Sequence, residues 1–169
     1  MRTQAEKGSA FRVLHERDSA FIIPNPWDVG TARLLAHLGF EALATTSARY
    51  AFSVGQRDNT IGRDQMMAHV RAIVAATDLP VSADLENGFG DSAETVAETI
   101  RRAAATGLVG GSIEDSTKRQ GDPVYELELA IVEALRSVAA PQSAREPEPA
   151  PDEPSQPCKD ERPTIAVAV

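Results

Sequence analysis

The feature that most constrains the fold of this chain is an alternation of short apolar runs with helix-forming stretches before residue 140. Each apolar run has the length of a buried strand, and each precedes a stretch with helical periodicity. Alternation of this kind predicts a parallel sheet covered by helices. The expected strands are 20–24, 41–46, 79–84 and 109–115, and the expected helices are 28–39, 63–77, 91–107 and 122–140.

Polar residues mark the starts of three of these helices. Asp28 is placed as the N-cap of the first helix, and Asp91 with Glu94 has the spacing of a capping box at the third. Asp122, followed by Pro123, is typical of the start of the last helix. The long segment between the second strand and its helix, residues 47–62, is expected to be a loop.

The composition changes sharply after residue 140. Residues 141–169 contain seven of the eleven prolines and none of the glycines, with no helical or strand period. We therefore expect a domain over residues 1–140 and a disordered tail over 141–169. The tail could be a linker to a missing domain, or foreign sequence joined by truncation or a shifted reading frame. Its last residues, "TIAVAV", could form a short strand that needs support from elsewhere.

Charge and composition exclude several classes of partner. The net charge of −8 argues against nucleic acid and anionic membrane surfaces. No apolar run approaches the roughly 18–20 residues of a membrane span, and the N-terminal stretch lacks the apolar region of a signal peptide. The single cysteine, Cys158, excludes an internal disulfide framework. We expect a cytoplasmic protein.

Acidic residues gather where the expected strands end. In "VSADLENGFGD" (81–91), Asp84 and Glu86 close the third strand ahead of a Gly-x-Gly turn; Glu114 closes the fourth, and Asp58 lies in the loop after the second. These ends meet at one edge of a parallel sheet, whether it is a TIM barrel or a doubly wound sheet. Asp84 and Glu86 could be loop acids that cap a helix. The matching positions of the other two acids favour a divalent cation such as Mg²⁺.

Three motifs in order resemble the isocitrate lyase / phosphoenolpyruvate mutase superfamily. They are "PNPWDVGTARLLAHLGFEALATTSA", "ADLENGFGD" and "GSIEDS", and the resemblance, which runs over about residues 18–140, is strongest to the 2-methylisocitrate lyase-like and carboxyphosphonoenolpyruvate mutase-like branch. It implies a partial TIM barrel of about four βα units, a homo-oligomer, and Mg²⁺ or Mn²⁺ as cofactor. It also implies a small 2-oxo or 2-hydroxy acid substrate, with C–C or P–C bond chemistry through an enolate.

The resemblance also implies roles for the acids. Asp84 matches the direct metal ligand, and Glu86 stands where many members have the second Asp of a D-x-D pattern. Glu114 resembles the third acid of the metal shell, and Asp58 resembles the loop acid that reaches metal-bound water.

The substrate carboxylate is expected at Thr45, Thr46 and Ser47, which fall where family members wrap it with hydroxyl and backbone N–H groups. The next residues, Arg49 and Tyr50, replace small residues of the family pattern.

Two departures leave the activity open. Family lyases carry a "K-[KR]-C-G-H" loop whose Cys is the general acid, whereas this chain has "STKRQGDPVY". Lys118 and Arg119 of this loop could meet an anionic substrate or be a solvated basic pair. The strands of the second half of the barrel, including one that carries a substrate-binding Arg, have no counterpart. Three hypotheses remain: a Mg²⁺-dependent lyase or mutase, an oxaloacetate-type 2-oxo acid hydrolase, and a non-catalytic remnant that associates with other chains. No catalytic residue is assigned.

Overall fold

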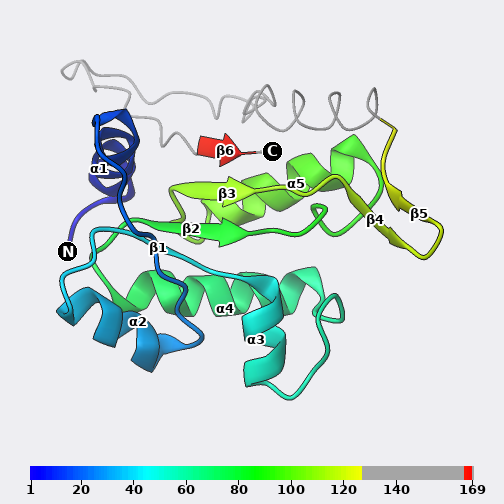
Figure 1. Cartoon of the computed structure of the whole chain (residues 1–169), viewed down its shortest axis with the longest axis horizontal. Helices are drawn as coiled ribbons and strands as arrows, with labels where there is room; N and C mark the ends of the chain where they lie inside the picture. The colour runs from blue at the N-terminus through cyan, green and yellow to red at the C-terminus, as the bar shows by residue number, and fades with distance from the viewer. Residues whose placement is uncertain (127–165, 169) are drawn as a thin grey trace, which may run out of the picture.

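A parallel sheet of four strands, in the order β1-β2-β3-β6, lies at the centre of the computed structural model, which describes residues 1–126 and 166–168 (Figure 1). The strands are β1 (Leu43–Ala44), β2 (Val81–Asp84), β3 (Gly110–Ser112) and β6 (Ala166–Ala168). Asp84 pairs with Ser112, so β2 and β3 end together at one edge of the sheet. We call this edge the carboxyl edge.

In the described part of the chain, five helices pack around this sheet, and a separate hairpin follows β3. The helices are α1 (Gln4–Glu16), α2 (Val29–His37), α3 (Ser47–Ser53), α4 (Arg63–Ala76) and α5 (Ala93–Ala104). Figure 1 shows α2, α3 and α4 together on one side of the sheet. The antiparallel hairpin consists of β4 (Ser116–Arg119) and β5 (Asp122–Val124). No helix among the described residues is long and apolar enough to cross a membrane.

The apolar positions predicted from periodicity form the core. The larger cluster joins the strands to α4 and α5 through Leu43, Val81, Met66, Val70, Ile73, Val96 and Ile100, all buried. A smaller cluster places Phe11 and Leu14 of α1 against Ala42 and Val109. In β2 the buried residues Val81 and Ala83 alternate with the partly exposed residues Ser82 and Asp84.

The structure confirms the α/β arrangement, but the first predicted strand is wrong. Residues 20–24 are irregular, because Pro24 and Pro26 lack the N–H groups that a sheet ladder needs. The segment still reaches β1, where the Ala44 N–H donates to the Pro24 carbonyl at 3.2 Å. Its apolar side chains, Phe21 and Ile23, pack against the smaller cluster.

Two helices lie where the sequence analysis gave no helix. The helix α3 occupies the first part of the predicted loop 47–62, and α1 precedes the first predicted element. The helix α1 begins with a complete capping box between Thr3 and Glu6. The three histidines lie on helices: His15 on α1, His37 on α2 and His69 on α4.

The third predicted helix starts later than expected. Its N-cap is Ser92, whose side chain accepts from the Thr95 N–H, so the predicted Asp91–Glu94 capping box is wrong. The Asp91 carboxylate instead accepts hydrogen bonds from the Tyr125 hydroxyl and from Arg119. By contrast, Asp28 caps α2 as predicted.

The expected helix start at Asp122 and Pro123 is also wrong, because both residues lie in β5. Gly121 has φ +120°, a conformation open to glycine, and it makes the turn that returns the chain along β4. The rest of that predicted helix, 127–140, lies outside the described residues, as does the predicted domain boundary at 140.

The prediction for the tail allowed a short strand in "TIAVAV", and residues 166–168 form one, β6, which pairs in parallel with β3. Residues 141–165 lie outside the described part of the chain, so the rest of that prediction stays untested. Whether the sheet is part of a TIM barrel also stays a prediction.

Candidate active site at the carboxyl edge

Asp84 closes β2 with a carboxylate that three hydrogen bonds hold in place. One oxygen, Oδ2, accepts from the Ser47 N–H at 2.9 Å and from the Ser47 hydroxyl at 2.8 Å. The other, Oδ1, accepts from the Glu86 N–H at 2.9 Å. Donors from two separate loops therefore fix the orientation of this carboxylate.

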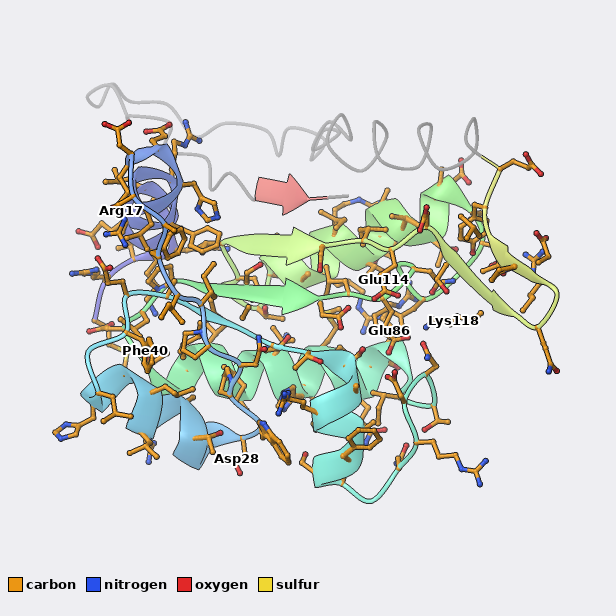
Figure 2. All side chains as sticks on the ribbon, in the orientation of Figure 1. Arg17, Asp28, Phe40, Glu86, Glu114 and Lys118 are labelled. Atoms are coloured by element: carbon orange, nitrogen blue, oxygen red, sulfur yellow. The ribbon has the colours of Figure 1, made fainter. Side chains whose placement is uncertain are left out.

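Glu86 is almost completely buried, with 1% of its surface exposed, and its backbone has φ +52°. Its Oε2 atom pairs with the Lys118 ammonium, whereas Oε1 has no hydrogen-bond partner among the described residues. The Glu114 N–H donates to the Glu86 carbonyl at 2.7 Å and joins the loops that follow β2 and β3. Figure 2 shows Glu86, Glu114 and Lys118 gathered at this end of the sheet.

The charges at this edge act on one another. Partial burial raises the pKa of Glu114, and the negative charges of Asp84, Asp58 and Asp115 raise it further. Burial lowers the pKa of Lys118, and Asp84 and Asp58 oppose that shift. The structure therefore brings the four predicted metal-shell acids into one electrostatic neighbourhood. Asp58 is its outermost member, in an exposed loop where its carboxylate accepts from the Asn59 N–H.

The donor set suits a hard cation that keeps part of its water. Among the described residues, no three His, Cys, Asp or Glu side chains already form a metal-holding group. Mg²⁺ commonly binds through one or two carboxylates and several waters, so it does not require a preformed protein cage. The unpartnered Oε1 of Glu86 is an oxygen that a hydrated cation could satisfy. The assignment of Asp84, Glu86, Glu114 and Asp58 to a metal stays a prediction.

The predicted substrate loop lies beside these acids. Thr45 is 3% exposed, and its hydroxyl has no partner among the described residues. Thr46 is the N-cap of α3, but its side chain makes no capping hydrogen bond. Ser47 donates both its N–H and its hydroxyl to Asp84. In this structure Ser47 therefore connects the loop to the predicted metal ligand, and the substrate role of Thr45 and Thr46 stays a prediction.

Sequence reasoning missed the residues that hold the hairpin over this edge. Lys118 pairs with the buried Glu86, so it is not a solvated cation, and Arg119 pairs with Asp91 at 2.8 Å. Asn87, itself buried, donates to the Tyr125 hydroxyl at 3.1 Å. These partners lie far apart in sequence. The only signal for Lys118 was its position shortly after the acids that follow β3.

A second missed contact supports α3. Tyr50 stacks on His69 of α4, with ring centroids 3.8 Å apart and planes 11° apart. Tyr50 was noted only as a departure from the family pattern. Its ring anchors the helix that presents Ser47 to Asp84.

Comparison with known proteins gives a family match over most of the chain. The family model described as phosphoenolpyruvate phosphomutase matches residues 11–148. A solved structure of a candidate lyase or mutase from Burkholderia cenocepacia J2315 is 60% identical, with a TM-score of 0.80, over 85% of this chain and 52% of that protein.

Two further relatives are named after an enzymatic activity. The 2,3-dimethylmalate lyase of Eubacterium barkeri is 34% identical over 96 residues, which is 56% of this chain and 33% of the lyase. A structure of oxaloacetate acetylhydrolase in complex with its product oxalate is 26% identical, with a TM-score of 0.72, over 82% of this chain and 50% of that protein. The chain therefore spans about half, or less, of the length of each relative.

Proposed function

This chain belongs to the phosphoenolpyruvate phosphomutase family, within the phosphoenolpyruvate mutase/isocitrate lyase superfamily, and we propose that it acts on a small 2-oxo or 2-hydroxy carboxylic acid with Mg²⁺ as cofactor. The reaction is the cleavage or rearrangement of a C–C or P–C bond next to the oxo group, through an enolate. The family and its lyase members support the reaction class. The oxygen-only donor set at the carboxyl edge supports the cation.

The observation that carries this proposal is the way the edge is held together. Asp84 is fixed by Ser47, while Glu86 and Glu114 are joined through their main chains. Lys118 balances the buried charge of Glu86. A chain that used these acids only as loop residues would not need a buried carboxylate with one unpartnered oxygen.

In this proposal the residues of the chain divide the work. Asp84, Glu86 and Glu114 hold the cation, and Asp58 acts through water. Bound Mg²⁺ supplies a positive charge that stabilises the negative charge developing on the substrate oxygen. Thr45 and Thr46 hold the substrate carboxylate with their hydroxyl groups and with the Thr46 backbone N–H, because the Thr45 N–H already donates to the Ser82 carbonyl at 3.0 Å. Lys118 reduces the repulsion among the acids and supports the hairpin that covers the edge.

A hydrolase that cleaves a 2-oxo acid such as oxaloacetate is the second candidate. The similarity to oxaloacetate acetylhydrolase favours it. So does the absence of Cys from residues 112–125, where family lyases carry their general acid. Product analysis separates the two: a hydrolase releases oxalate and acetate from oxaloacetate, whereas a lyase releases pyruvate or glyoxylate from its substrate.

The assembly around this site is part of the proposal. We propose that the sheet is half of a TIM barrel and that the chain forms a homo-oligomer. If the chain turns over none of these substrates, the third hypothesis, a non-catalytic remnant that associates with other chains, replaces the enzyme.

The test is calorimetric titration of the purified chain with Mg²⁺, in the presence and absence of oxalate as an enolate mimic. Oxalate should strengthen saturable Mg²⁺ binding, and Asp84→Asn should weaken that binding about tenfold or more. The matched control is Asp18→Asn, because Asp18 is exposed and lies in a different part of the chain. Unchanged Mg²⁺ affinity in a folded Asp84→Asn variant would refute the metal site.

A further inference from the structure

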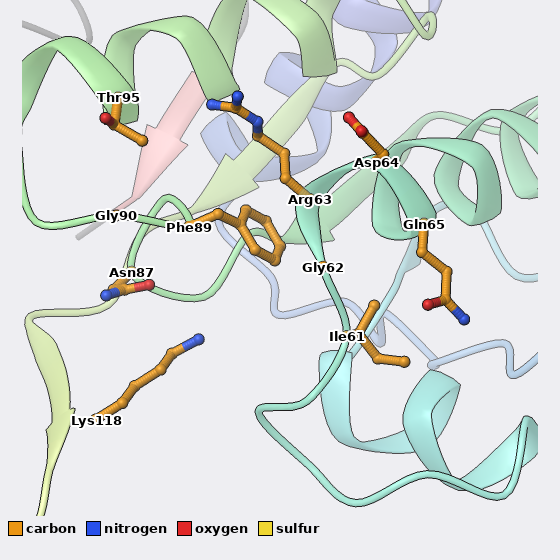
Figure 3. A pocket seen from close by; sticks show the side chains of 10 residues that line it. All are labelled: Ile61, Gly62, Arg63, Asp64, Gln65, Asn87, Phe89, Gly90, Thr95 and Lys118. Atoms are coloured by element: carbon orange, nitrogen blue, oxygen red, sulfur yellow. The ribbon is translucent and has the colours of Figure 1, made fainter.

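A pocket of about 700 Å³ lies next to the carboxyl edge, between the turn that follows β2 and the start of α4 (Figure 3). Lys118 belongs to both places, because it lines this pocket and also pairs with Glu86. Any ligand that extends from the carboxyl edge past Lys118 therefore enters this space. The roles proposed above leave the pocket itself unused.

Among the described charged side chains that line the pocket, Arg63 is the one without an opposite charge beside it. Asp64 also lines the pocket, and its charge is balanced by Arg102 of α5 at 2.5 Å. The Lys118 charge is balanced by Glu86. Arg63 has no carboxylate partner among the described residues, and its guanidinium makes only a long contact, 3.5 Å, with the Thr99 hydroxyl. The pocket therefore favours an anionic group.

Hydrogen-bond donors at the start of α4 add to this preference. The N-cap of α4 is Gly62, which provides no capping side chain, so the first backbone N–H groups of α4 have no acceptor among the described residues. Asn87 is 5% exposed and is held through its amide nitrogen by the Tyr125 hydroxyl. Its remaining polar atom is the amide oxygen, an acceptor, which does not contribute to the binding of an anion.

The remaining wall is apolar. Phe89 and Ile61 line the pocket between its polar groups, and the Lys118 ammonium lies 5.7 Å from the centre of the Phe89 ring. A short hydrocarbon segment can lie against these side chains while its charged end meets Arg63. The arrangement suits a ligand whose hydrocarbon segment ends in a carboxylate better than a compact monocarboxylate.

We propose that this pocket binds the distal carboxylate of a 2-oxo dicarboxylic acid, and that Arg63 is the residue that selects for it. The inference rests on the proposed function, because it places the 2-oxo end of the same molecule at the carboxyl edge. The Arg63 guanidinium would donate two parallel, charge-assisted N–H bonds to this carboxylate, and the first backbone N–H groups of α4 would donate further bonds.

The test compares ligands that differ only at their far end. With Mg²⁺ present, calorimetry measures the affinities of 2-oxoglutarate and 2-oxoadipate against those of 2-oxopentanoate and 2-oxohexanoate, which end in a methyl group. The dicarboxylates should bind about tenfold or more tightly. Arg63→Gln should remove most of this ratio, and Arg63→Lys should keep part of it because the charge remains. The matched control is Arg71→Gln, an exposed position on the same helix.

Oxalate binding distinguishes failure of the pocket proposal from failure of the proposed function. It has no distal segment, so Arg63→Gln should leave oxalate binding unchanged, which also shows that the variant is folded. If oxalate binds but the wild-type chain does not distinguish the paired ligands, the pocket proposal is wrong and the proposed function stands. If the wild-type chain binds neither oxalate nor Mg²⁺, the proposed function fails first. A preference for dicarboxylates that survives Arg63→Gln would overturn the role of Arg63.

Discussion

The acids of the carboxyl edge differ in how their charges are balanced. Asp84 accepts hydrogen bonds from Ser47 and Glu86, and Glu86 pairs with Lys118. Glu114 lies among like charges that raise its pKa. A bound cation would therefore oppose this shift, because it would favour the ionised form of Glu114.

A buried histidine predicts how stability depends on pH. His69 is 8% exposed beneath Tyr50, and its Nε2 has no partner among the described residues. Burial lowers its pKa from 6.5 to about 4, and the negative charge of Asp28 opposes the shift. The unfolded chain therefore binds a proton that the folded chain does not. Stability is complete above about pH 6.5 and falls as the pH is lowered toward 4, by about 3 kcal/mol at most.

Urea unfolding at pH 7 and pH 4.5 measures this effect. His69→Phe keeps an aromatic ring against Tyr50 and removes the titrating group. The free energy of unfolding of this variant should therefore decrease less from pH 7 to pH 4.5 than that of the wild type. His37→Phe, at an exposed position, should retain the wild-type loss. An equal loss in the wild type and in His69→Phe would show that other groups cause the pH dependence.

At the scale of elements, sequence patterns predicted what local chemistry determines. Asp28 caps α2 through bonds to Thr31, three residues away, and the apolar face of α4 lies in the core. The capping role given to Asp91 failed because Tyr125 and Arg119, distant in sequence, take its carboxylate. No local pattern shows that competition. The predicted strand at 20–24 failed because its apolar residues fit a core position while its prolines prevent a ladder.

The candidate site also combines features that the sequence predicts with features that it does not. The common edge of Asp84, Glu86 and Glu114 was predictable, because parallel strands end together. The Lys118–Glu86 pair was not, since it depends on a hairpin whose second strand lies at the predicted start of a helix, and on a left-handed backbone at both residues.

The turn between β2 and α5 provides a prediction for an element boundary. Gly88 has φ +74°, and a Cβ there would lie 2.7 Å from Val96 Cγ2 and 3.1 Å from Val96 Cα. Because the neighbour includes main chain of α5, it cannot simply rotate away. Gly88→Ala should lower the free energy of unfolding by roughly 2–4 kcal/mol, through strain and overpacking together.

A second glycine separates the two causes. Gly55 has a similar φ of +71°, but nothing lies within 4 Å of its Cβ position. Gly55→Ala should therefore cost only the backbone strain, about 1 kcal/mol. Equal losses for the two variants in urea unfolding would mean that the contact between the turn and α5 is looser than the structure shows.

At the scale of the molecule, three adjacent strands assemble the whole candidate site. The loop after β1 supplies Thr45, Thr46 and Ser47, the loop after β2 supplies Glu86, and the segment after β3 supplies Glu114 and Lys118. The chain spans about half the length of its solved relatives, yet it contains these neighbouring strands in order. This arrangement makes Mg²⁺ binding a fair test of the chain on its own, even where turnover needs more of the fold.

The last strand of the sheet leads to a prediction about association. β6 covers the outer edge of β3, where Gly110 and Gly111 present backbone without side chains to hinder pairing. An uncovered edge of this kind pairs readily with other chains.

Deleting residues 166–169 should therefore lower the free energy of unfolding and raise the mass in solution as concentration increases, measured by light scattering after gel filtration. Deleting Val169 alone, which lies beyond the paired residues, is the control. If the longer deletion leaves both the mass and the stability as in the wild type, then β6 does not cover β3 in solution.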